Sequence, residues 1–338
     1  MRITRESLIQ TAKQYVAQYL RRNRQIISIY LAGSLLSDEP LLGGTTDIDL
    51  FFIHDSDPIK KREMVELSDE VHLDIAHFSQ SLFRQPRMLR VDPWIAPFIC
   101  LNPICLHDTQ HWLEFTQSSV CTQYERPDYV LERARTFSTQ ARQMWMSLKI
   151  GMVEGEKQRA LTFLQSLERA ANAILTLNGK PLTERRLLVH FPQRTEALGC
   201  PGMAAGFVDI IMPQPVPDKT WETWMVDWEA AFRHAGEVEE SPARLHPCRV
   251  TYYKNAARGL RGTNPAAALW TILHTWTLAI SLLPDDSEHL PRWQSAQQTL
   301  GLGVENEPES IRSLDAYLDN VEETLDRWAD KMGVVTTL

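Results

Sequence analysis

The spacing of apolar residues changes once along the chain, near residue 125, and this change limits the folds that the chain can adopt. Before it, β-branched and aromatic residues form apolar runs of strand length at 26–32, 47–54, 71–78 and 103–107. After it, apolar residues recur at helical spacing and runs of the strand type nearly vanish. The pattern predicts an α+β fold, with a small mixed sheet and flanking helices in a domain 1–125 and a larger all-helical domain 126–338.

Helical spacing marks two segments of the first domain and most of the second. Segment 5–21 is amphipathic, and 58–70 (P-I-K-K-R-E-M-V-E-L-S-D-E) is rich in helix formers, which predicts a strand-helix-strand order. In the helix predicted at 218–236, three tryptophans at i, i+3 and i+7 indicate a face that packs in a core: Trp221, Trp224 and Trp228. The helices predicted for the second domain are 128–153, 155–177, 182–190, 218–236, 247–261, 265–283, 287–300 and 308–332.

One of these helices has the composition of a membrane span. The stretch from Ala266 to Leu283 contains no formally charged residue over a length near the lower limit for crossing a bilayer. It also contains His274, three threonines and Ser281, and prolines at 265 and 284 bracket it as helix start and stop signals. We therefore expect the central helix of a helical bundle and no membrane partner.

Acidic residues outnumber basic ones by 43 to 35, and the formal net charge is −8. Proteins whose main task is to bind nucleic-acid backbone usually carry a basic domain or stripe, so this balance argues against a nucleic-acid partner. A small anionic co-substrate that is held through a metal ion remains compatible with it.

The cysteines and the first residues bear on the compartment. The five cysteines, at 100, 105, 121, 200 and 248, form no CxxC pair, and their odd number does not indicate a disulfide framework or a zinc site. The first residues, M-R-I-T-R-E-S-L, are charged and helix-periodic and lack the pattern of a signal peptide. We expect reduced thiols in a cytoplasmic protein.

Three aspartates interrupt apolar runs of the first domain. Asp47 and Asp49, in D-I-D-L-F-F, are two residues apart and point to the same face of a strand. Neighbouring carboxylates repel each other unless a cation lies between them, and Mg²⁺ is the cation that prefers oxygen ligands. Asp74 interrupts V-H-L-D-I-A-H-F, and it joins the pair if the strands 47–54 and 71–78 are neighbours. The three aspartates predict a site for one or two Mg²⁺ ions of the kind used in phosphoryl and nucleotidyl transfer.

Gly33 and Ser34 follow the first strand. A glycine at a strand-to-helix turn lets the backbone approach a ligand, and the N–H groups that open a helix bind anions, with the serine hydroxyl as a further donor. These two residues therefore predict contacts to the terminal phosphates of a nucleoside triphosphate.

The ordered set of motifs resembles the polymerase-beta-like nucleotidyltransferase superfamily. The motifs are A-G-S (32–34), G-G-T-T-D-I-D-L (43–50) and L-D-I (73–75), and the resemblance covers residues 26–80. Among its members, the aminoglycoside nucleotidyltransferases also place a helical domain after this one. The resemblance implies that Asp47 and Asp49 bind magnesium and that Asp74 completes the site and assists in deprotonating an acceptor. It also implies that Gly33 and Ser34 contact the triphosphate of ATP or another NTP.

The sequence departs from the family in two places and leaves alternatives open. Thr46 stands where many members have serine, and the spacer from Ser34 to Asp47 is longer and acidic. The aspartates of 47–49 could also be a solvated pair on an edge strand. His72 could act as a base or orient the metal site, or be a surface or hydrogen-bonded histidine, and His54 could be structural. The basic run 60–62 could steer phosphate or be the solvated face of a helix.

Three functions agree with the motifs. The first is transfer of a nucleoside monophosphate, AMP from ATP, to a hydroxyl of a small polar acceptor. The others are a non-catalytic nucleotide-sensing or antitoxin-type binding protein, and an enzyme that transfers AMP to protein side chains. The expected partners are an NTP and a small-molecule acceptor, and the sequence does not indicate an oligomeric state.

Overall fold

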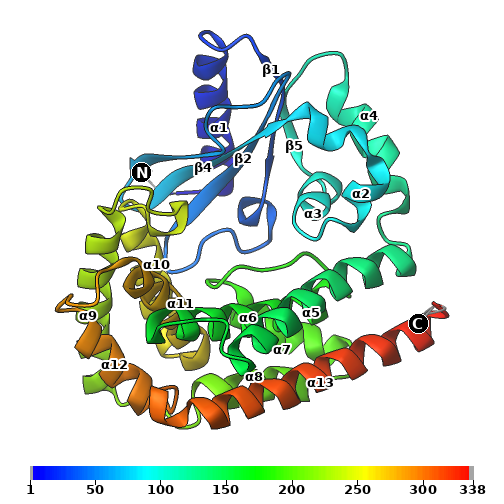
Figure 1. Ribbon diagram of the computed structural model, residues 1–338. Helices are drawn as coiled ribbons and strands as arrows, with labels where there is room; N and C mark the ends of the chain where they lie inside the picture. Colours follow the sequence, from blue (N-terminus) through cyan, green and yellow to red (C-terminus); the bar gives the residue numbers. More distant parts are fainter. Residues whose placement is uncertain (1–2, 335–338) are drawn as a thin grey trace. The chain divides into compact units, whose positions relative to one another are not determined.

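A computed structural model describes residues 3–334 of the chain. Its class is α+β, as predicted: a five-stranded mixed sheet lies in the N-terminal part and the rest is mostly helical (Figure 1). The chain divides into two compact units, unit 1 from Met1 to Tyr129 and unit 2 from Val130 to Leu338.

The sheet of unit 1 has the strand order β3-β4-β2-β1-β5, so β2 is its central strand. β2 and β4 are parallel, whereas the other neighbouring pairs are antiparallel. The predicted strand segments are confirmed, and a fifth strand, β3, is added to them. The strands are β1 (Ile26–Ala32), β2 (Thr46–His54), β3 (Arg62–Ser68), β4 (Val71–Ser79) and β5 (Ile104–Asp108).

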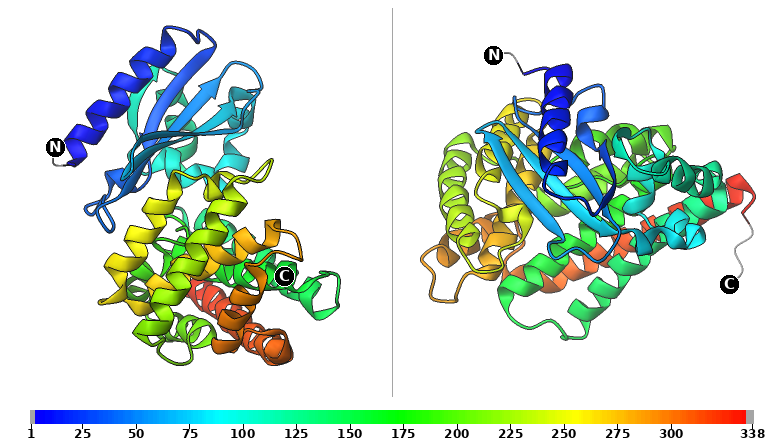
Figure 2. Two further views of the ribbon diagram at one scale, coloured as in Figure 1. Left: turned by 90° about the vertical axis from the view of Figure 1, so that its left-hand side faces the viewer. Right: turned by 90° about the horizontal axis from the view of Figure 1, so that it is seen from above.

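Helices cover both faces of this sheet. On one face, residues such as Ile29, Leu31 and Leu50 pack against the apolar side of α1 (Arg5–Leu20), which lies against the sheet (Figure 2). On the other face, Tyr30 and Phe51 belong to a second apolar cluster formed with three short helices. These are α2 (Pro86–Val91), α3 (Ile95–Cys100) and α4 (Trp112–Val120). Short 3-10 helices η1 (Ser34–Leu36), η2 (Gln80–Arg84) and η3 (Cys121–Gln123) complete the unit.

The helices of unit 2 surround a buried central helix, α11 (Pro265–Leu282). This helix is long and apolar enough to cross a membrane, yet 78% of it is buried inside the protein, as predicted for the central helix of a bundle. Trp221, Trp224 and Trp228 of α9 are also buried, as predicted. The helices are α5 (Pro127–Lys149), α6 (Glu156–Thr176), α7 (Leu187–Ala197), α8 (Gly202–Ile211), α9 (Asp218–Gly236), α10 (Arg249–Arg261), α11 (Pro265–Leu282), α12 (Leu290–Thr299) and α13 (Glu307–Met332), with 3-10 helices η4 (Ala243–Leu245) and η5 (Val304–Asn306).

The prediction of a helix at 58–70 is wrong, because most of this segment forms the strand β3. The strand pairs antiparallel with β4, and Val65 packs against the apolar cluster beneath α1. Its other side chains are largely exposed at the edge of the sheet, so no apolar alternation marks it as a strand. Pairing with a neighbouring strand has overridden the local helix propensity.

Two features of unit 2 also differ from the prediction. α7 begins at Leu187 rather than at 182, because the side-chain amide of Asn172 hydrogen-bonds both the N–H and the C=O of Leu182. α8 was not predicted, since G-C-P-G-M has the composition of a loop. Its core face consists of Met203, Phe207 and Ile211, spaced four residues apart.

The expectation of reduced thiols is wrong for two of the five cysteines. Cys100, at the end of α3, forms a disulfide with Cys121, at the start of η3. These cysteines are 21 residues apart, and only the packing of the helices brings their Cα atoms to 5.2 Å. Cys105, Cys200 and Cys248 are free thiols. A cytoplasmic location stays a prediction, and structural disulfides are more frequent in oxidising compartments.

Candidate metal centre

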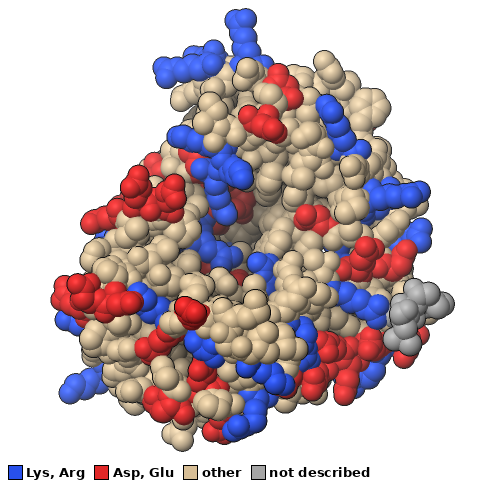
Figure 3. Space-filling model, in the orientation of Figure 1, with Lys and Arg blue, Asp and Glu red and all other residues tan. Residues whose placement is uncertain are grey.

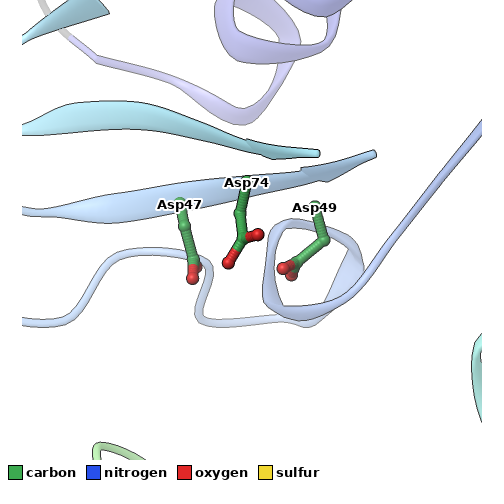
Figure 4. Close-up of side chains that lie close together, drawn as sticks. All are labelled: Asp47, Asp49 and Asp74. Atoms are coloured by element: carbon green, nitrogen blue, oxygen red, sulfur yellow. The ribbon is translucent and has the colours of Figure 1, made fainter. Parts of the chain in front are cut away.

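The three predicted aspartates meet at one place on the sheet of unit 1. Asp47 and Asp49 project from β2, and Asp74 projects from β4 on the same side (Figure 4). The parallel register places Asp49 directly opposite Asp74. One carboxylate oxygen from each residue lies within 4.8 Å of the others. Between residues 3 and 334 this is the one group of three or more His, Cys, Asp or Glu side chains close enough to share a metal ion.

Burial makes this cluster costly without a cation. Asp47 and Asp74 are only 7% and 3% exposed, and Asp49 is half-buried. A buried charge is stable only when it is paired or bound to a metal. The alternative of a solvated pair on an edge strand is wrong, because β2 is the central strand and Asp47 is buried.

Gly33 lies against this cluster and tolerates no side chain. Its φ of +85° is a conformation that L-residues rarely adopt, and a Cβ atom added there would lie 1.7 Å from Oδ2 of Asp49. The hydroxyl of Ser34 donates a hydrogen bond to Oδ1 of Asp47 over 3.4 Å. Both predicted phosphate-binding residues are therefore neighbours of the aspartates. The helix expected after them is only the three-residue η1, so it offers no extended helix N-terminus.

The spacer between Ser34 and Asp47 is ordered by a tight turn. Leu42 and Thr45 exchange two backbone hydrogen bonds around Gly43 and Gly44, both of which have positive φ. The hydroxyl of Thr46 donates to the carbonyl of Pro40 over 3.0 Å. Gly43 and Gly44 thus form a turn, and Thr46 fixes the loop that leads into β2.

Arg62 is a member of the site that the sequence interpretation missed. Its guanidinium donates from Nε to Oδ1 of Asp74 over 2.6 Å and from Nη2 to Oδ2 over 2.5 Å. The basic run 60–62 does not lie on a helix: Arg62 is the first residue of β3, and its side chain is 48% exposed although it pairs with Asp74. The turn residues S-D-E (68–70) before β4 could have indicated a hairpin, which places Arg62 on the same face as Asp74.

Of the nearby histidines, His72 lies next to Asp47, whereas His54 lies at the other end of β2. His72 is buried and lies opposite Asp47 in the register of β2 and β4. His54 ends β2, and its Nε2 lies 2.9 Å from Nδ1 of His77. His54 therefore contacts His77 at the end of β2 that lies away from the aspartates, and this contact is structural.

Three carboxylates at one point are a donor set that suits a hard divalent cation such as Mg²⁺. The chemistry of the donors and their burial therefore fit the metal that the motifs predict. No protein-family model matches the chain, and no curated protein matches it either. A functional proposal consequently depends on the chemistry of these side chains.

Proposed function

We propose that the protein is a magnesium-dependent nucleotidyltransferase that moves a nucleoside monophosphate, AMP from ATP, to a hydroxyl of a small polar acceptor. The observation that carries the proposal is the convergence of Asp47, Asp49 and Asp74 beside Gly33 and Ser34. This order of motifs resembles the polymerase-beta-like nucleotidyltransferases, and the helical unit 2 after the sheet agrees with that layout.

In this proposal Asp47 and Asp49 hold the magnesium ion, which when bound neutralises phosphate charge and favours ionisation of an acceptor hydroxyl. Asp74, kept in place by Arg62, accepts the proton of that hydroxyl. The hydroxyl oxygen forms a bond to the α-phosphorus, the bond from that phosphorus to the leaving oxygen breaks, and pyrophosphate departs. Backbone at Gly33 and the hydroxyl of Ser34 contact the triphosphate.

The charge of the chain favours a cationic or neutral acceptor over a nucleic acid. The net charge is −8, and on the face shown in Figure 3 Lys and Arg are interspersed with Asp and Glu rather than gathered in a basic stripe. A polyhydroxylated amine of the aminoglycoside type is the acceptor class that the resemblance suggests.

The test is release of pyrophosphate from ATP and Mg²⁺ in the presence of a panel of polyhydroxylated amines. Asp49→Asn should lower the rate by on the order of 10³-fold, since the loss of one electrostatic stabiliser of a transition state has effects of this size. Asp55→Asn, an exposed aspartate just after β2, is the matched control and should keep full activity. Full activity of Asp49→Asn would exclude Asp49 as a ligand. Binding of ATP by calorimetry without turnover of any acceptor would favour the nucleotide-sensing alternative.

A further inference from the structure

Unit 2 contains a cavity of about 160 Å³, where the end of α5 meets α6, α12 and the start of α13 (Figure 1). The floor of this cavity is apolar and buried. Leu148, Phe163, Leu164 and Trp293 line it, and each is at most 7% exposed. An apolar cavity of about 150 Å³ holds a benzene molecule, so this cavity has room for one aromatic ring.

Two carboxylates and one guanidinium lie on the more exposed side of the cavity. Glu156, the first residue of α6, and Glu307, the first residue of α13, are half-buried and line it. Nε of Arg159 donates to Oε1 of Glu307 over 2.5 Å. The other two nitrogens of this guanidinium donate to the carbonyls of Val153 and Leu148, over 2.9 and 3.1 Å. Arg159 therefore neutralises Glu307, and each of its nitrogens already has a partner.

Glu156 and a buried amide are less completely matched. Oε2 of Glu156 accepts a hydrogen bond from Nε2 of Gln294 over 2.6 Å, but no ion pair within residues 3–334 includes Glu156. Gln297, one turn further along α12, lines the cavity and is 2% exposed. Its Nε2 donates to Oγ1 of Thr277 over 3.4 Å, and in the part of the chain that the structure describes no hydrogen bond ends on its Oε1. The cavity thus presents a carboxylate and an amide oxygen that a ligand can engage.

We propose that this cavity binds a small arylalkylammonium ion, with the aromatic ring on the apolar floor and the ammonium group toward Glu156. An ammonium group carries the charge that a carboxylate attracts, and it has three N–H donors, which a carboxylate and an amide oxygen accept. An anion is disfavoured, because the guanidinium of Arg159 is already engaged. Apolar walls with a few polar groups that fix the orientation of a ligand are typical of small-molecule sites. The proposal goes beyond the proposed function and rests neither on the metal site nor on the transfer reaction.

The measurement is binding of 2-phenylethylammonium to the full chain by isothermal titration calorimetry in buffer with Mg²⁺. The matched neutral and anionic probes are 2-phenylethanol and phenylacetate. The amine should bind with a Kd of about 1 mM or lower, as expected for a ligand of this size. The alcohol should bind about fivefold more weakly, because it lacks the charge that Glu156 attracts, and phenylacetate more weakly still. Absence of amine binding, or tighter binding of phenylacetate than of the amine, would overturn the proposal.

Glu156→Gln tests the charge of the carboxylate. It keeps an oxygen that accepts from Gln294, so it should weaken binding of the amine about fivefold and leave binding of the alcohol unchanged. Glu154→Gln is the matched control, since Glu154 is exposed and lies outside the lining of the cavity, and it should change neither affinity. Equal affinity of Glu156→Gln and the wild type for the amine would contradict the assignment of Glu156.

Ala160→Phe tests the location. Ala160 is half-buried and lines the cavity from α6, so the added ring should occupy the cavity and abolish binding of the amine. This variant leaves the acidic site of unit 1 intact, and therefore shows whether the amine binds there instead. Amine binding that survives in folded Ala160→Phe would overturn the proposal; folding is checked by circular dichroism. If Ala160→Phe does not fold, the difference between Glu156→Gln and Glu154→Gln still decides the matter.

Discussion

Each unit contains a group of buried acids, and the two groups differ in their surroundings. This difference distinguishes acids that stabilise the fold from acids that can bind a ligand. In unit 2, Glu168 and Glu184 are buried, and each lies within 4 Å of the guanidinium of Arg244, at 3.8 and 3.7 Å. Nε2 of His274 lies 3.4 Å from Glu168, and the hydroxyl of Tyr253 donates to Glu184 over 2.5 Å. The chain supplies a partner for every acid in this group.

The acids of unit 1 are arranged differently. Two of the three carboxylates are buried, and one oxygen of each lies within 4.8 Å of the others. The acids of unit 2 are described in ion pairs with basic side chains, an arrangement that stabilises a fold, whereas converging carboxylate oxygens are the donor set of a divalent cation. The difference teaches that the convergence of carboxylate oxygens on one point, more than the burial of an acid, points to a ligand.

The largest expected effect on stability comes from making the same chemical change in both groups. Glu168→Gln removes the buried negative charge that faces Arg244 and His274. It should lower the free energy of unfolding by roughly 3–5 kcal/mol. Asp47→Asn relieves repulsion among three neighbouring carboxylates in metal-free buffer, so it should lower the free energy of unfolding by less than Glu168→Gln does. Urea unfolding with a chelator measures both, and Glu323→Gln, on the exposed side of α13, is the control. An equal loss in Asp47→Asn would show that the acidic cluster is compensated within the chain.

Glu168 also makes the stability of the folded protein depend on pH. Burial raises the pKa of Glu168, but Arg244 and then His274, with Arg169, more than offset this and hold the pKa at about 2. Because the folded-state pKa lies below the unfolded value, the stabilisation is present above about pH 4.5 and is lost as the pH falls toward 2, about 3 kcal/mol in all. In Glu168→Gln this part of the acid sensitivity should be missing.

Gly33 and Gly44 offer a second comparison within unit 1, with a smaller effect. Both have positive φ, but a Cβ atom at Gly33 would meet Asp49, whereas at Gly44 nothing lies within 4 Å. Gly44→Ala should cost about 1 kcal/mol from the backbone alone. Gly33→Ala should cost about 2–3 kcal/mol, because the added carbon also displaces Asp49. Only Gly33→Ala should weaken binding of Mn²⁺; unchanged Mn²⁺ binding would show that the close contact does not position the carboxylate.

The sequence predicts those parts of the fold and site that depend on local pattern. Asp47, Asp49 and Asp74 interrupt apolar runs, so both their strands and their common face follow from a period of two. Arg62 could not be found in this way, because β3 is an edge strand with exposed side chains and a helix-forming composition. The disulfide between Cys100 and Cys121 depends on how α3 and η3 pack, which no spacing records. Apolar alternation thus gives the acids, whereas the place of Arg62 follows from the pairing of β3 with β4, for which the turn at 68–70 is the one local signal.

The smallest expected effect is at the far end of β2 and β4, where a buried titratable group is stabilised by staying neutral. Burial, then His54 and Lys60, lower the pKa of His77 to about 4. Oε2 of Glu63 lies 3.7 Å from Nε2 of His77. The folded-state pKa is below the unfolded value of about 6.5, so the unfolded chain takes up the proton first as the pH falls. Stability should therefore fall between about pH 6.5 and 4, by about 1 kcal/mol from pH 7 to 5 after allowing for solvent screening. Urea unfolding at these two pH values should show a smaller loss in His77→Gln than in the wild type, and equal losses would mean that His77 is charged in the folded protein.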